Sequence, residues 1–314
     1  MFFLIVEKQW LVNKTNKDFL EYLSRKASIS TALAQIFINR GIKDAETIRD
    51  FLSPSIKNLH DPFLMPDMRK AVERIKNVLA DGAAVLVCGD YDADGITSTA
   101  LLVSALRMFG LKTHYHIPNR ITEGYGLSKE GVLRAKALGA RLIITVDCGV
   151  SSEEEVSMAV AQGIGVIITD HHEPPERLPD AEAIINPHRR DSVYPFKYLA
   201  GVGVAYKLVQ ALKQLTVNSE QLTETEKLLA LVAIGTVADS VPLIGENRIL
   251  VTYGLKALNS NSAGPWVSIL RETSGTSDKE LRSSLLSYTL IPRINAAGRV
   301  GEADEVVELF LTQD

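Results

Sequence analysis

The sequence contains little cysteine and no long hydrophobic run. Only two cysteines, Cys88 and Cys148, occur in 314 residues, and both lie beside acidic motifs. Two such residues form no disulfide framework, and we interpret them as small buried side chains in a reducing compartment. The opening stretch MFFLIVEKQW is apolar for only six residues before Glu7, which is too short for a secretory signal or a membrane span. We therefore expect a cytoplasmic protein with no membrane segment.

The sequence also lacks the surplus of basic residues that is usual in nucleic-acid-binding domains. Its formal charge of −4 at pH 7 argues weakly against a nucleic-acid partner. That charge omits bound ions, and two divalent cations held by aspartates would bring it to about zero. With 314 residues, 46% of them hydrophobic, the chain is long enough for one large domain or two ordinary ones.

Apolar runs alternate with amphipathic stretches from about residue 82, a pattern typical of β-α-β units. The expected strands lie at residues 84–89, 113–118, 141–149, 165–170 and 181–187. A helix should follow residue 150, where Ser152 and Glu155 have the spacing of a capping box. Continuous apolar strands joined by helices predict an α/β fold with a parallel β-sheet flanked by helices.

The two ends of the chain differ from this middle part. Residues 1–75 are expected to form an N-terminal helical extension, interrupted by prolines, before a catalytic domain at 76–314. From about residue 200 the pattern is mostly helical, notably at 224–239 and 247–259. The final stretch EADEVVELFLTQD predicts a helix without a Gly or Pro stop signal. We therefore expect the chain to be the front portion of a longer protein.

The stretch GDYDADGITSTALL places three aspartates at alternate positions, namely Asp90, Asp92 and Asp94. A calcium-binding EF-hand loop begins in this way, but it lies between two helices and needs a Glu at its twelfth position, which is Leu101 here. An apolar strand precedes the motif instead, and a helix is expected to begin near Thr97 and Ser98. The motif therefore indicates a strand whose carboxyl end delivers three carboxylates into a turn.

Further ligand-type residues follow other expected elements. Asp147 follows the third strand, Asp170, His171 and His172 follow the fourth, and Asp239 ends a helical run before Pro242. Ligands gather outside the carboxyl ends of parallel strands, so we expect these side chains to meet. Carboxylates this dense would repel one another unless cations neutralised them, and oxygen ligands with added imidazole favour manganese or magnesium. Two such ions ~3.5–4 Å apart can promote hydrolysis of a phosphate ester.

Each residue taken alone has a simpler interpretation. Asp147 could cap the following helix, the two histidines could be a satisfied pair at a strand end, and Asp239 could be a turn residue. Neighbouring strand residues point to opposite faces, so His171 and His172 can serve one site only where the strand has already turned into a loop. The joint placement of these residues after strand ends favours the metal site.

Four motifs in this order, DYDADG, VDCG, TDHHE and VADSVPL, resemble the DHH phosphoesterase superfamily. Within it, the stretches HIPNRITEGYGL, NPHRRDSVYPFKYLAGVGVAYKL and RINAAGRVGEAD are similar to the RecJ family of single-strand-specific exonucleases. Relatives that act on pyrophosphate or small dinucleotides resemble H-x-x-x-D-x-D in the first motif. Here Cys88 takes the first position, which agrees with the RecJ family instead.

The resemblance implies a role for individual residues. The implied ligands of two Mn²⁺ or Mg²⁺ ions are Asp92, Asp94, Asp147, His171 and Asp239. The implied catalytic residues are Asp90, Asp94, Asp147 and His172. The implied substrate-binding residues are Arg120, Arg299, His172 and Asn295. Arginine suits such positions because a guanidinium group pairs with phosphate through two hydrogen bonds.

The function that the resemblance implies is a 5′-to-3′ exonuclease of DNA repair and recombination with a two-metal phosphodiesterase core. Single-stranded DNA would be its substrate, with a repair helicase and a single-strand-binding protein as partners. The family's downstream substrate-binding and oligonucleotide-binding domains are absent from these 314 residues. One alternative is a DHH-family phosphodiesterase for short oligonucleotides or cyclic dinucleotides. The other is a non-catalytic replication scaffold with the same fold, which the complete set of expected ligands disfavours.

Overall fold

The computed structural model describes residues 15–215, 226–260, 262–301 and 303–312. The chain divides into two compact units, of which the first ends at Ser55 and the second begins at Ile56. The helices of the first unit are α1 (Lys17–Ala27), α2 (Thr31–Asn39) and α3 (Ala45–Leu52). They pack around a small apolar cluster that includes Leu23, Phe37 and Ile48. Residues 1–14 of the predicted extension lie outside the described residues.

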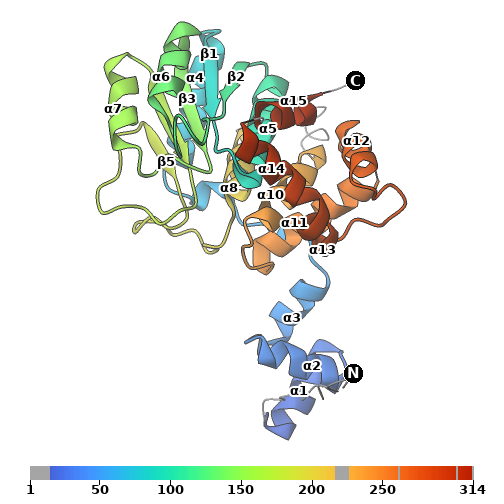
Figure 1. Ribbon diagram of the computed structural model, residues 1–314. Coiled ribbons are helices and arrows are strands. Elements are labelled where there is room, and N and C mark those ends of the chain that lie inside the picture. Colours follow the sequence, from blue (N-terminus) through green and yellow to red (C-terminus); the bar gives the residue numbers. More distant parts are fainter. Residues whose placement is uncertain (1–14, 216–225, 261, 302, 313–314) are drawn as a thin grey trace, which may run out of the picture. The chain divides into compact units, whose positions relative to one another are not determined.

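The second unit is built on a parallel sheet of five strands (Figure 1). The strands are β1 (Ala84–Cys88), β2 (Lys112–His116), β3 (Ala140–Val146), β4 (Gly165–Thr169) and β5 (Ala183–Ile185). Their order is β2-β1-β3-β4-β5, and each neighbouring pair is parallel. Every strand overlaps one of the predicted ranges, so the predicted α/β fold is confirmed.

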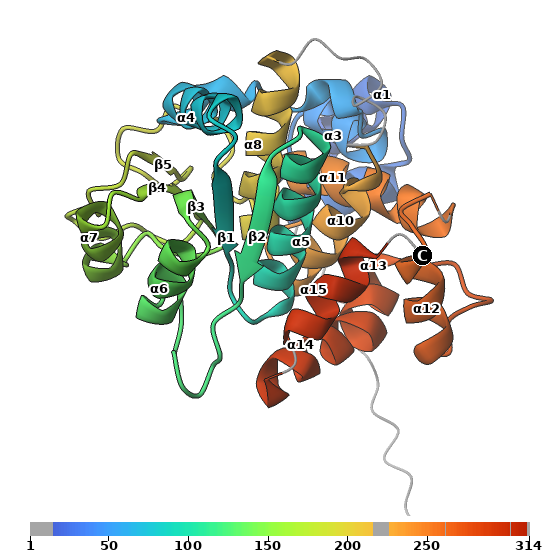
Figure 2. The same ribbon diagram turned by 90° about the horizontal axis from the view of Figure 1, so that it is seen from above.

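Helices cover both faces of this sheet (Figure 2). One face packs against α4 (Met68–Ala80), α5 (Ala93–Met108) and α8 (Gly201–Leu215). The other face packs against α6 (Lys129–Ala137) and α7 (Glu153–Ala161). Successive strand residues alternate between the two cores: Val85 and Val87 face the first, and Leu86 faces the second. Burial on both faces explains why β1 is a continuous apolar run, whereas the edge strand β2 is mostly polar.

The remaining elements are mostly helical, as predicted from about residue 200. The bounds of these helices are α10 (Leu229–Ala238), α11 (Gly245–Asn259), α12 (Trp266–Thr273), α13 (Ser283–Leu285), the π-helix η3 (Leu286–Leu290), α14 (Ile291–Val300) and α15 (Ala303–Leu311). Two short 3₁₀ turns, η1 (Ile56–Asn58) and η2 (Pro62–Leu64), precede α4. Helix α10 packs against α5, α8 and α11. This packing brings the end of α10 to the same edge of the sheet as the start of α5.

Two local predictions were wrong at helix starts. Helix α5 begins at Ala93 rather than near Thr97, because Asp92 is its N-cap and accepts the N–H of Asp94 at 2.9 Å. Thr97 lies inside the helix, where its hydroxyl donates to the carbonyl of Ala93 at 2.7 Å. Ser152 is the N-cap of α7, but its side chain accepts no capping hydrogen bond. The predicted capping box is therefore not formed.

Residues 56–75, which the sequence pattern assigned to the N-terminal extension, lie in the same compact unit as the sheet. Helix α4 extends across the predicted boundary between residues 75 and 76, and it packs against β5 and α8. Among the described helices, none has both the length and the apolar character needed to cross a membrane.

Candidate metal centre

The carboxyl ends of β1, β3 and β4 lie side by side at one edge of the sheet. Strands β1 and β3 are neighbours although β2 lies between them in the sequence. The strand order therefore reverses between β1 and β3, and open α/β sheets bind ligands at such a point. Asp92 follows β1, Asp147 follows β3 and His171 follows β4. Asp239 is the C-cap of α10 and reaches the same place from the helical part. The structure thus brings together residues that are far apart in the sequence.

Three overlapping groups of ligand atoms lie within coordination range in the described part of the chain. Within each group, one ligand atom from every residue lies within 4.8 Å of the others. The groups are Asp90, Asp92 and Asp147; Asp94, His171 and Asp239; and Asp147, His171 and His172. Asp147 and His171 each belong to two groups. This sharing is the arrangement expected around two neighbouring ions rather than one.

Several buried oxygen atoms of this cluster have no hydrogen-bond partner among the described residues. They are Oδ1 of Asp90, Oδ1 of Asp147 and Oδ2 of Asp239. His171 Nε2 lies 3.2 Å from Asp147 Oδ1, and His171 Nδ1 lies 3.7 Å from Asp239 Oδ2, but neither contact is a hydrogen bond. Donor atoms that converge without bonding to one another leave a place for a cation between them. The residues present therefore fit a divalent metal ion.

Burial and mutual repulsion make the charged form of these carboxylates costly. Burial, followed by the charge of Asp92, raises the pKa of Asp90 to about 7 and that of Asp239 to about 6. Burial and neighbouring carboxylates raise the pKa values of Asp94 and Asp147 well above the usual range. Bound cations would reverse this effect, because they stabilise the ionised form.

Asp147 has an unusual backbone conformation at the centre of the cluster. Its φ of 59° lies in the left-handed region, which costs a residue other than glycine roughly 1–2 kcal/mol. Its N–H donates to the carbonyl of Thr169 at 3.0 Å, and its own carbonyl accepts the hydroxyl of Tyr125 at 3.0 Å. These bonds hold the strained turn in place. Ser152, not Asp147, is the N-cap of the following helix, so the capping interpretation of Asp147 is wrong.

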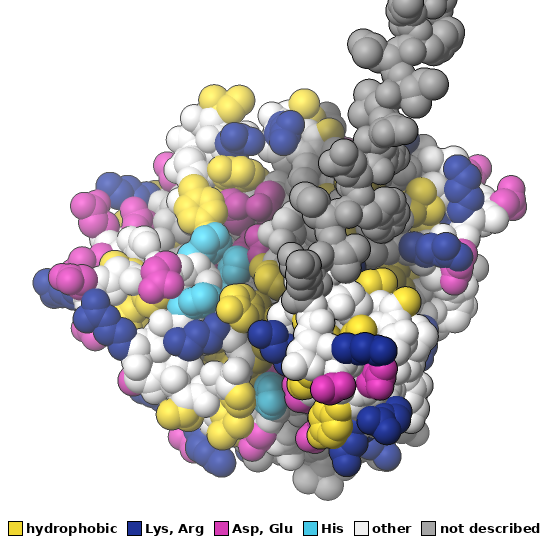
Figure 3. Space-filling model, turned by 90° about the horizontal axis from the view of Figure 1, so that it is seen from below, with side chains coloured by type: hydrophobic (Ala, Val, Ile, Leu, Met, Phe, Trp, Pro, Cys, Tyr) yellow, Lys and Arg dark blue, Asp and Glu magenta, His cyan; other side chains and the backbone are white. Residues whose placement is uncertain are grey.

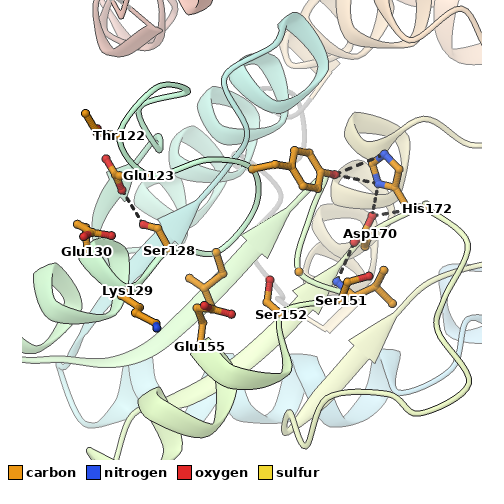
Figure 4. A pocket seen from close by; sticks show the side chains of 14 residues that line it. Thr122, Glu123, Ser128, Lys129, Glu130, Ser151, Ser152, Glu155, Asp170 and His172 are labelled. Carbon is orange, nitrogen blue, oxygen red and sulfur yellow. Dashed lines mark hydrogen bonds and ion pairs between the residues drawn. The ribbon is translucent and has the colours of Figure 1, made fainter.

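Both histidines lie in a loop because β4 already ends at Thr169, which meets the condition derived from the sequence. Asp170 orients them: its Oδ1 accepts the N–H groups of His171 and His172 at 2.7 Å and 3.1 Å. The same oxygen lies 2.8 Å from His172 Nδ1, and Oδ2 accepts the N–H of Val150 at 2.9 Å (Figure 4). Asp170 was expected among the ligand-type residues after the fourth strand, but it belongs to none of the three ligand groups and orients the two histidines instead.

The two histidines differ in charge preference. Burial, followed by the charge of His172, lowers the pKa of His171 to about 4, which keeps this imidazole neutral and suited to a metal ion. The hydrogen bond with Asp170 raises the pKa of His172. Burial opposes ionisation of Asp170, but its bonds to His172 outweigh burial, and the pKa of Asp170 is lowered. Asp170 and His172 therefore form an oriented, charge-assisted pair.

A hollow of about 460 Å³ opens beside His172 (Figure 4). Tyr125, Ser151, Glu155 and Asp170 are among the residues that line it. Tyr125 is 54% exposed, and its hydroxyl lies 3.2 Å from His172 Nδ1. On the face shown in Figure 3, histidine side chains reach the surface next to acidic side chains. The cluster is therefore accessible to a substrate.

A second hollow, of about 230 Å³, is lined by Arg120 and neighbouring residues of the loop that follows β2. The guanidinium of Arg120 lies 5.4 Å from the ring centre of Tyr91. Gly298, which precedes Arg299, lines the same hollow from α14. Asn295 ties this helix to the acidic loop, because its Oδ1 accepts the N–H of Ala93 at 2.8 Å.

A parallel sheet with this ligand cluster at its switch point defines an α/β protein with a candidate two-metal centre. Residues 84–236 match the family model described as DHH family, N-terminal domain. The chain contains a domain of the DHH family. Within that family it is homologous to the RecJ proteins.

Curated relatives share the name single-stranded-DNA-specific exonuclease RecJ. The protein of Bacillus subtilis (strain 168) is 39% identical over 313 residues, which is 99% of this chain and 38% of the relative. The protein of Dickeya dadantii (strain 3937) is 43% identical over 295 residues, which is 91% of this chain and 50% of the relative. The chain thus spans half or less of the length of these relatives.

Solved structures agree with this result. The chain is similar to RecJ from Thermus thermophilus in complex with Mn²⁺, with a TM-score of 0.78, 30% identity and coverage of 96% of this chain and 42% of that one. For the complex of the same protein with Mg²⁺, the TM-score is 0.69 at 28% identity, with coverage of 96% and 39%.

Proposed function

We propose that this chain contains the two-metal phosphodiesterase core of a 5′-to-3′ exonuclease for single-stranded DNA. The observation that carries the proposal is the set of three overlapping ligand groups at the switch point of the sheet, in which Asp147 and His171 each belong to two groups. The names of the curated relatives supply the substrate class and the type of reaction. We assign the catalytic domain to residues 76–314, within the compact unit that begins at Ile56, and the extension to residues 1–75.

Two Mn²⁺ or Mg²⁺ ions are the proposed cofactors. Their proposed ligands are Asp92, Asp94, Asp147, His171 and Asp239, with Asp94 and Asp147 serving both ions. A set of mainly carboxylate ligands with one neutral imidazole suits these metals. When bound, the ions would activate a water molecule and offset negative charge on the phosphate. Asp90, buried beside Asp92, is the proposed catalytic carboxylate next to them.

His172 is the proposed contact to the scissile phosphate. Asp170 holds Nδ1 of this ring at 2.8 Å, so the imidazole is fixed in orientation and its charged form is favoured. A fixed cationic donor stabilises the negative charge that develops on the phosphate oxygens during hydrolysis. Asp170 and Tyr125 would act through His172 and Asp147 as positioning residues.

Arg120, Arg299 and Asn295 are the proposed contacts to the rest of the DNA strand. The two arginines would hold backbone phosphates by bidentate hydrogen bonds. Asn295 uses its amide oxygen for the N–H of Ala93, which leaves the amide nitrogen as the group for the substrate. Residues of the loop that follows β2 line both the hollow at Arg120 and the one beside His172, and Glu123 lines each of them. One DNA strand would contact both hollows.

The cellular setting proposed for this activity is DNA repair and recombination in the cytoplasm. Such an enzyme acts on strands that a helicase has separated and that a single-strand-binding protein covers. We therefore propose both proteins as partners, on the basis of the substrate class alone.

The test is Mn²⁺-dependent degradation of single strands labelled at the 5′ or the 3′ end. A duplex, a labelled dinucleotide, the Asp147→Ala variant and the Asp180→Ala variant are assayed in parallel. Asp180 is an exposed carboxylate outside the cluster, so its variant should behave like the wild type. Early release of labelled mononucleotide from the 5′ label, lost only in Asp147→Ala, is the expected result.

Other outcomes would contradict the proposal. Cleavage of the dinucleotide alone would indicate a phosphodiesterase for short substrates instead. Full activity of Asp147→Ala, purified without metal, would exclude the proposed metal centre. Binding of Mn²⁺ without cleavage of any substrate would exclude an autonomous catalytic core in this chain.

A further inference from the structure

The first turn of α8 points its backbone N–H groups at the candidate metal centre. The N–H of Gly201 donates to Asp94 Oδ2 at 2.7 Å, and the N–H of Val202 donates to Asp94 Oδ1 at 3.0 Å. Asp94 itself is only 2% exposed. Both oxygens of this buried carboxylate are thus held by the start of a helix of 15 residues.

The approach of α8 to the carboxylates leaves no room for a side chain at Gly201. A Cβ atom at this position would lie 2.2 Å from Asp147 Oδ1, although real Cβ atoms keep at least 3.0 Å from other atoms. On the opposite side, a Cβ atom at Gly235 of α10 would lie 2.6 Å from Asp94 Oδ1. Asp94 and Asp147, the two residues assigned to both ions, are therefore enclosed by backbone that only glycine permits.

The helix start also compensates the charge of the cluster. A helix N-terminus carries about +0.5 of an elementary charge, and here its N–H groups face both oxygens of Asp94. Each carboxylate oxygen has more than one lone pair, so an oxygen that accepts an N–H can still coordinate a metal ion. The helix can therefore orient Asp94 without competing with the ions.

We propose that Gly201 and the Val202 N–H are positioning elements that set the metal affinity of the site. They hold Asp94 in the orientation in which it contributes to the ligand cluster, and the missing side chain of Gly201 lets Asp147 lie beside it. The inference rests on the proposed function, because it concerns the same metal centre. Comparable partners behind metal ligands change affinity by about 10- to 100-fold when they are removed.

Two substitutions perturb this contact in different ways. Gly201→Ala adds a Cβ atom that pushes Asp147 out of place. Val202→Pro replaces the N–H that Asp94 Oδ1 accepts with a ring CH₂ group, so it removes this bond and displaces Asp94 without placing a methyl group against Asp147. Proline is tolerated in the first turn because the N–H there has no partner within the helix.

The matched control lies in the same turn of α8. At Gly203, a Cβ atom would meet only the side chain of Leu199, with the nearest atom at 3.1 Å. Gly203→Ala therefore adds the same methyl group without touching a carboxylate. It also shows whether an alanine in this turn disturbs the fold.

The experiment measures binding of Mn²⁺ to the 314-residue chain by electron paramagnetic resonance of the free ion. Circular dichroism with chemical unfolding in a chelator shows which variants fold. We expect Gly201→Ala and Val202→Pro to bind Mn²⁺ about 10- to 100-fold more weakly than the wild type, and Gly203→Ala to bind within about twofold of it. If Gly201→Ala does not fold, the weaker binding expected of a folded Val202→Pro carries the test.

Wild-type affinity in folded Gly201→Ala and Val202→Pro would overturn the inference and leave the metal centre intact. An equal loss in Gly203→Ala would also overturn it, because that methyl group touches no ligand. Failure of the wild-type chain to bind Mn²⁺ would instead refute the proposed function, and the inference with it.

Discussion

Replacing Asp170 with asparagine is a sharp test of how the loop that carries His171 and His172 is held. The carboxylate is 1% exposed and accepts backbone N–H groups through both oxygens: Oδ2 from Val150 at 2.9 Å and Oδ1 from His171 at 2.7 Å. Oδ1 also lies 2.8 Å from Nδ1 of His172. Asparagine has a single amide oxygen, so its NH₂ group must face one of these donors. Whichever orientation it takes, at least one buried N–H loses its acceptor.

The size of the effect follows from these contacts. A buried donor without a partner costs about 1–3 kcal/mol, and the metal-free variant should lose at least this much free energy of unfolding. The imidazole of His172 also loses the charged partner that orients it. Removal of a group that orients a catalytic ligand costs about 10- to 100-fold in activity. Stability and Mn²⁺-dependent cleavage should therefore fall together.

Urea unfolding in the presence of a chelator measures the first effect, and release of labelled mononucleotide from single-stranded DNA measures the second. Asp180→Asn is the matched control, because Asp180 is exposed, and a surface substitution should stay within about 0.5 kcal/mol of the wild type. A variant Asp170→Asn that unfolds at the same urea concentration as the wild type and cleaves DNA at the same rate would refute the reasoning.

Three further changes have predictable outcomes. Glu123 Oε1 accepts the N–H of Asn119 at 3.0 Å and Oε2 accepts the hydroxyl of Ser128 at 2.6 Å in the loop that carries Arg120. Glu123→Gln removes one of these acceptors, worth about 1 kcal/mol, and should raise KM for single-stranded DNA about 3- to 10-fold with kcat unchanged; unchanged KM in steady-state kinetics would contradict this. The Lys207 ammonium and the Glu246 carboxylate are buried and lie 2.6 Å apart. Lys207→Met leaves the carboxylate without its partner and should lower the free energy of unfolding in urea by about 3–5 kcal/mol. Adding Glu246→Gln should recover part of this free energy. The fold raises the pKa of Asp90 from 3.8 to about 7, which contributes stability that is complete below about pH 4 and is lost as the pH rises through about 7. The free energy of unfolding of the metal-free wild type should therefore fall more between these pH values than that of Asp90→Asn. Equal slopes of unfolding free energy against pH would exclude the effect.

The fold class could be predicted because burial on both faces leaves a clear trace in a sequence. A strand such as β1 is apolar throughout because helices cover both sides of the sheet, so its residues form a continuous run that can be recognised directly. The ligand types could be predicted for a related reason. Parallel strands all end at one edge, so the strand pattern alone predicts that an aspartate after β1 and another after β3 meet there.

Helix boundaries and capping bonds were harder to predict. The start of α5 was placed near Thr97, whereas Asp92 caps the helix and Asp94 lies in its first turn. The sequence shows several residues that can cap a helix, and the choice among them depends on which one packing leaves at the turn. The same limit explains Ser152, which occupies the predicted N-cap without making the predicted bond.

The sequence by itself determined the parallel sheet, the order of its elements and the chemical character of the edge where aspartates and histidines gather, because these depend on local apolar patterns and on the common direction of the strands. Only the tertiary structure decided how that edge is held together. Asp94 is bonded to the start of α8, and Asp147 is bonded to Tyr125 and packs against Gly201. These contacts join segments that are distant along the chain. No local pattern specifies such pairs, because their geometry arises only when the helices pack against the sheet.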